Sequence, residues 1–147
     1  MAFNTGYLGD PQRTGGGERY GDNVVVLAAT TFEDGLKVGR FAKLDAGSID
    51  NMDGSATPVI AGVVLRNVAA PVEAGSAIDA TLTDHVNYVR AGLVTVEVKE
   101  GEEPEQFDEV FADNTGATAG LAATAGIETG AEFIREEKPG VWLVRLK

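Results

Sequence analysis

The stretch that most constrains the fold of this chain is residues 86–98, Val-Asn-Tyr-Val-Arg-Ala-Gly-Leu-Val-Thr-Val-Glu-Val. Apolar and polar side chains alternate in it, with a break at Arg90, Ala91 and Gly92. Alternation with a period of two is typical of half-buried antiparallel strands, because successive side chains point to opposite faces. We therefore predict two short strands joined by a tight turn at residues 90–92. This hairpin contains no group suited to catalysis, which favours a structural or binding role.

Other apolar runs of strand length are separated by turn signals along the rest of the chain. The pattern predicts strands at residues 23–31, 39–44, 58–65, 76–82, 110–112, 131–135 and 141–146, and a loop at residues 45–57. Residues 117–125 also alternate and favour a strand; a helix is the alternative, weakened by interleaved threonine and glycine. Many short strands without a convincing amphipathic helix predict an all-β fold, either a small β-barrel or a jelly-roll-like sandwich of short antiparallel strands.

The N-terminal segment differs in composition from the rest of the chain. Residues 1–21 hold six of the 19 glycines, and their apolar residues show no period. Such a segment cannot bury enough apolar surface to offset its ordering entropy. We predict a flexible glycine-rich arm at residues 1–21, which either stays disordered or orders against a neighbouring subunit, and a single β domain at residues 22–147. The candidate partner-binding residues are the arm's large apolar side chains and arginines, since aromatics and arginine dominate interface energetics: Phe3, Tyr7, Leu8, Arg13, Arg19 and Tyr20.

The charge balance and the absence of cysteine exclude several classes of function. The net charge is −11, which repels phosphate backbones and anionic lipid surfaces, so we expect neither nucleic-acid nor membrane partners. No cysteine is available for a disulfide, a thiolate metal site or a nucleophile. The chain has no signal-peptide pattern and no apolar run near the roughly 20 residues that span a bilayer. We expect a soluble protein made in a cytoplasm.

A search for catalytic or metal-binding residues finds no convincing set. His85 is the only histidine, and the serines lie in glycine-rich loops with no base close in sequence. Residues 51–54 resemble part of a calcium loop but lack its first acid and its closing glutamate. Asp45, Asp50 and Asp53 form either a loose surface cation site or a plain polar turn. Residues 15–17, three glycines, are not followed by the Lys-Ser/Thr of a phosphate loop. We predict no catalytic residues, metal ligands or cofactors.

Residues 97–109 form a polar loop with seven acids against Lys99. The loop either meets a basic patch on a partner or serves solubility.

Three segments in this order, residues 39–44 (Gly-Arg-Phe-Ala-Lys-Leu), 59–65 (Val-Ile-Ala-Gly-Val-Val-Leu) and 89–96 (Val-Arg-Ala-Gly-Leu-Val-Thr-Val), are followed by a closing strand at residues 141–146. From about Asp22 to the C-terminus the chain resembles the capsid cement (decoration) proteins of tailed bacteriophages. The resemblance implies a small β-barrel or jelly-roll-like domain on the outside of an icosahedral head, spanning seams between major capsid protein subunits. It also implies self-association as a dimer or trimer, synthesis in the bacterial host cytoplasm and residence on the outer capsid surface of the virion.

Three functions are therefore compatible with the sequence. The first is a non-enzymatic capsid cement protein. The second is a structural component of a phage tail or baseplate. The third is a small β-barrel ligand-binding module, which needs a concave pocket lined by several aromatic residues.

Overall fold

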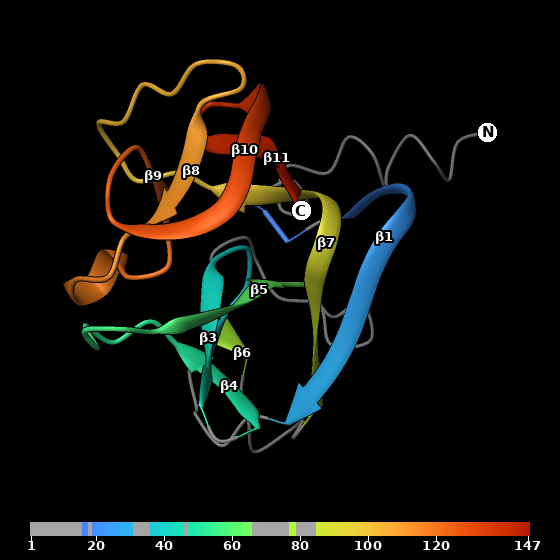
Figure 1. Ribbon diagram of the computed structural model, residues 1–147. Helices are drawn as coiled ribbons and strands as arrows, with labels where there is room; N and C mark the ends of the chain where they lie inside the picture. The colour runs from blue at the N-terminus through green and yellow to red at the C-terminus, as the bar shows by residue number, and fades with distance from the viewer. Residues whose placement is uncertain (1–15, 18, 31–35, 46, 66–76, 79–84) are drawn as a thin grey trace.

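The computed structural model describes residues 16–17, 19–30, 36–45, 47–65, 77–78 and 85–147 (Figure 1). Within them the only helical element is η2, a single 3-10 turn at Gly116–Thr118, so the all-β prediction is confirmed. The strands are β1 (Arg19–Thr30), β2 (Leu36–Lys37), β3 (Phe41–Asp45), β4 (Ser48–Asn51), β5 (Val59–Val64), β6 (Ala77–Ile78), β7 (His85–Glu97), β8 (Glu109–Ala112), β9 (Ala122–Ala123), β10 (Ile127–Lys138) and β11 (Val141–Leu146).

β7 is one continuous strand, so the predicted hairpin at residues 90–92 is wrong. The sequence break marks an irregularity within the strand instead. Gly92 has φ of 108°. Val89 and Val94 lie in the same apolar cluster although they are five positions apart, a spacing that puts side chains on opposite faces of a regular strand. The inward-facing side of β7 therefore changes between them. The strand continues through this point because β1 and β11 pair with it on either side and satisfy its backbone groups.

The first part of β7 belongs to a ring of strands. The pairings run from β1 to β4, β3, β5 and β7, and β7 pairs back to β1. All are antiparallel except the contact between β1 and β4, in which Thr30 lies opposite Ser48. This ring surrounds a cluster of buried side chains: Leu36, Val38, Ala42, Ile49, Ala61, Val64, Val86 and Tyr88.

The second part of β7 begins a curled sheet that continues through β11, β10, β8 and β9. A parallel bridge between Val98 and Ala122, with a 2.8 Å hydrogen bond from the Lys99 amide to the Ala122 carbonyl, brings β9 back beside the end of β7. The concave side of this curled sheet covers a larger cluster of apolar side chains, which also includes Phe41 and Val63 from the ring. Figure 1 shows β8–β11 on one side of the molecule and β3–β6 on the other, with β7 running beside β1 and then turning from the second group to the first.

Several strand predictions are confirmed and two are corrected. The expected strands at residues 39–44, 58–65, 131–135 and 141–146 correspond to β3, β5, β10 and β11. The expected loop at residues 45–57 contains β4, whose strand character comes from pairing with β3. Residues 117–125 form neither one strand nor one helix: η2 ends at Thr118 and β9 spans two residues. Small residues carry a weak local signal, so tertiary contacts decide their conformation.

Candidate functional site

β1 presents the clearest candidate interaction surface among the described residues. Val24 and Val26 pack against the core, whereas Val25 and Leu27, which alternate with them, are 49% and 42% exposed. One edge of β1 pairs with β7. On its other edge, the described residues provide a partner only at Thr30, which lies opposite Ser48. An open strand edge with exposed apolar side chains is a template for pairing with another chain.

The predicted arm residues are only partly within the described structure. Phe3, Tyr7, Leu8 and Arg13 lie outside the described residues. Arg19 and Tyr20 begin β1, which therefore starts before the expected domain boundary at residue 22. They lie opposite Val94 and Leu93 of β7, and the Arg19 side chain is exposed.

Gly16 and Gly17, just before β1, are buried against the body of the protein. The Gly17 amide donates a 2.7 Å hydrogen bond to the Thr95 carbonyl. A Cβ on Gly16 would lie 3.2 Å from Glu97 and 3.3 Å from the Gly39 Cα. This part of the glycine run therefore allows close backbone packing against β7, so the chain enters β1 from a fixed position.

Sequence reasoning missed a second exposed apolar feature, Phe107, which is 62% exposed and has φ of 70°. It lies in the acidic loop between β7 and β8, for which the sequence indicated either contact with a basic partner patch or a role in solubility, without singling out Phe107. The one available signal was a lone aromatic residue inside a run of acids. Two further exposed apolar residues, Leu44 and Val59, lie opposite each other on β3 and β5 as a cross-strand pair.

The expected acidic turn around Asp53 contains a cation from the protein itself. The Lys43 ammonium group lies 2.7 Å from the Asp53 carboxylate, and Ser55 also donates to that carboxylate through its backbone and hydroxyl groups. The hydrogen bond from Lys43, followed by those from Ser55, lowers the pKa of Asp53 to about 2. No group of three or more His, Cys, Asp or Glu side chains within the described part of the chain is arranged to hold a metal ion.

We expect Asp53→Asn to weaken the acid dependence of stability. Because the folded-state pKa is below the ordinary value of 3.8, the unfolded chain takes up this proton first as the pH falls. The pair's contribution is present above about pH 4 and is lost as the pH falls towards about 2. Thermal unfolding of both proteins from pH 7 to 2 should show a melting-temperature difference that narrows across this window. A melting-temperature difference that stays constant from pH 7 to 2 would contradict the lowered pKa of Asp53.

Two further carboxylates, the buried Asp113 and the partly buried Glu97, have structural partners. Burial acts to raise the pKa of Asp113, but hydrogen bonds from Thr118 and Thr115 and the charge of Lys99 outweigh it, and the pKa is lowered. These bonds hold the turn around η2. Burial raises the pKa of Glu97, opposed by the Arg40 guanidinium at 3.6 Å. Arg40 in turn donates to the carbonyls of Ala117 and Ala119. Both carboxylates thus join distant segments.

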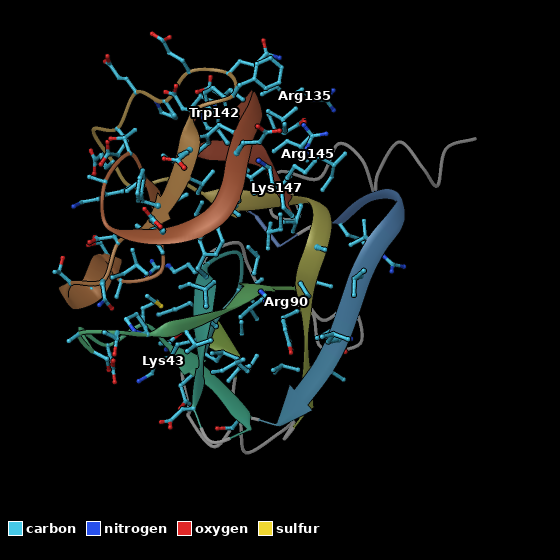
Figure 2. The ribbon with its side chains drawn as sticks, viewed as in Figure 1. Lys43, Arg90, Arg135, Trp142, Arg145 and Lys147 are labelled. Carbon is cyan, nitrogen blue, oxygen red and sulfur yellow. The ribbon has the colours of Figure 1, made fainter. Side chains whose placement is uncertain are left out.

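Figure 2 shows Trp142 near the start of β11, Arg145 and Lys147 towards its end, and Arg135 on the neighbouring β10. Arg145 forms an ion pair with Glu132, and Arg135 lies 2.7 Å from Glu137. The hydrogen bond from Arg145 lowers the pKa of Glu132. These arginine charges are therefore largely balanced within the protein.

None of the helical segments in the described part of the chain has the length and apolar character of a membrane span.

Comparison with known proteins places this geometry in a family. A family model described as the XM1 gp53 minor capsid protein matches residues 6–147. A chain in the solved structure "The capsid of Myoviridae Phage XM1" is 34% identical, with a TM-score of 0.80 over 99% of this chain and 97% of that one. A search of curated proteins finds no match.

Proposed function

The chain belongs to the XM1 gp53 minor capsid protein family, and we propose that it acts as a cement protein on the outside of the phage head. A structural role in the head follows from the family and from the capsid match. The proposal adds that the protein binds the major capsid protein and stabilises contacts between its subunits. The capsid match favours the head over a tail or baseplate position.

The observation that carries the proposal is the edge of β1 that, among the described residues, is paired only at Thr30, together with the exposed Val25 and Leu27 on this strand. A monomer that exposes Val25 and Leu27 on such a strand risks aggregation unless a neighbour covers them. An extended segment of a capsid subunit that pairs with this edge would extend the sheet and bury both side chains. The arm, with Phe3, Tyr7, Leu8 and Arg13, would lengthen the same contact.

The negative net charge of the chain favours a location on the outer face of the shell. The interior of a filled head holds DNA, a dense polyanion, and a chain with net charge −11 is repelled from it. A protein that binds the assembled shell more tightly than free subunits stabilises the shell by mass action. Copies that also contact one another gain avidity on the lattice.

Deleting residues 1–15 should weaken head binding by about tenfold or more, equivalent to about 1.4 kcal/mol, if the arm supplies anchors. This truncation keeps Gly16, Gly17 and all of β1, whereas removal of residues 1–20 would cut into the ladder with β7. The measurement is co-sedimentation with expanded heads that lack this protein, with unexpanded heads as the control. Equal occupancy by truncated and full-length protein would contradict the role of the arm, provided both melt at the same temperature.

A further inference from the structure

Phe107 combines two unusual properties. It is 62% exposed, the highest value among the large apolar side chains of the described residues. It is also the one non-glycine residue with positive φ in that part of the chain. The third position of a turn with positive φ usually holds glycine or asparagine, and a bulky residue there is strained. Burial does not compensate this strain, since the ring faces solvent. Such strain at an exposed side chain points to a function for the ring.

The turn that carries Phe107 is fixed to the core of the curled sheet. The Asp108 amide donates to the Glu105 carbonyl at 3.1 Å, and the Asp108 carboxylate accepts from the Glu105 amide at 2.9 Å. The Phe107 amide donates to the Phe133 carbonyl at 2.7 Å, and the Phe133 amide donates to the Asp108 carbonyl at 2.9 Å. Phe133 itself is fully buried. The ring is therefore held in one position before any partner arrives, which reduces the entropy lost on binding.

The surroundings of Phe107 define the charge of its partner. Exposed acids lie on both sides of it in the loop and at the start of β8: Glu100, Glu103, Glu105, Asp108 and Glu109. An aromatic residue inside a charged rim is the usual arrangement of an interface anchor. The matching surface is an apolar pocket surrounded by lysine and arginine. A second copy of this chain fits poorly, because its 23 acids outnumber its 12 lysines and arginines.

We infer that Phe107 and its acidic rim form a docking tip that inserts into a basic-rimmed apolar pocket on another protein of the head. This inference rests on the proposed function and names a contact separate from the arm and β1. The ring supplies the apolar contact area, and the acids select and orient the partner through charge complementarity.

Phe107→Gly tests the inference because it removes the ring and relieves the strain together. We expect its affinity for expanded heads to fall about tenfold or more. Its melting temperature should stay unchanged or rise, because glycine adopts positive φ freely. Val59→Ser is the matched control, since Val59 is 60% exposed and lies on β5; its head binding should equal that of the wild type. A double variant, Glu103→Gln with Glu105→Gln, should bind more weakly and lose part of the salt dependence.

The outcomes separate this inference from the proposed function. If the wild type binds heads and Phe107→Gly binds equally well, the docking tip is wrong and the cement proposal stands. If Val59→Ser weakens binding as much as Phe107→Gly, general loss of surface apolarity explains the effect and the tip is again wrong. If Phe107→Gly loses self-association in sedimentation but still binds heads as the wild type does, the partner of Phe107 is a second copy of this chain. That result would overturn the inference. If the wild type does not bind heads, both proposals fail.

Discussion

Gly62→Ala is expected to destabilise the protein by about 3 kcal/mol or more, or to prevent folding, because it places a side chain inside a backbone contact. A Cβ on Gly62 would lie 2.0 Å from the Val89 carbonyl oxygen and 2.9 Å from its carbon. Val89 lies in β7 and pairs with both Val63 of β5 and Val26 of β1. Its backbone cannot move away without opening a ladder of the ring.

Gly47→Ala is the matched control for this prediction. Gly47 also has positive φ, 89°, but no atom lies within 4 Å of its hypothetical Cβ. The free energy of unfolding of Gly47→Ala should fall by only about 1–2 kcal/mol, which is the cost of a left-handed backbone for a residue with a side chain. Urea unfolding of the three proteins measures the difference. Equal stability of the Gly62 and Gly47 variants would contradict the close approach of β5 and β7.

Phe133→Ala should destabilise the protein by about 3–5 kcal/mol, because it removes a fully buried ring from the core of the curled sheet. The ring lies 5.4 Å from that of Trp142, in an edge-to-face arrangement at 76°. Its loss leaves a cavity and removes this aromatic contact.

Phe107→Ala is the comparison for Phe133→Ala, since it removes the same kind of side chain from an exposed position. Alanine also carries a Cβ, so the positive φ at this position costs about the same in both proteins. Its stability should stay within about 0.5 kcal/mol of the wild type. Thermal unfolding of both variants gives the test, and similar losses for the two phenylalanines would contradict their assignment to core and surface.

Much of the strand content could be predicted from local patterns. The strand expected at residues 141–146 is β11, in which Val144 and Leu146 lie in the core and Trp142 packs against it. The continuity of β7 could not be predicted in this way. The break at residues 90–92 is a real local signal, but the same signal suits a turn or a strand irregularity, and only the distant partners β1 and β11 decide between them.

The candidate surfaces show a similar limit. Arg19 and Tyr20 were singled out by residue type alone, and the structure places them in β1. Which edge of that strand has few partners among the described residues depends on which strands pair in the ring, and no local sequence pattern indicates the contact between Thr30 and Ser48. Phe107 was missed because exposure of an aromatic residue is set by the turn and by its hydrogen bonds to Phe133. Sequence patterns report faces of elements, whereas exposed edges and loop tips depend on the assembled fold.

Stabilisation of the phage head by this capsid protein would be measured as the heat resistance of the shell. Expanded, DNA-filled heads that lack the protein would be heated with and without purified protein added back, and DNA release would be followed by dye fluorescence. If the protein is a cement, we expect a higher release temperature that saturates with added protein, and no binding of the protein to unexpanded heads. An unchanged release temperature when the protein fills all its sites on the head would contradict the cement role. The protein would then be a component of the head that does not stabilise it.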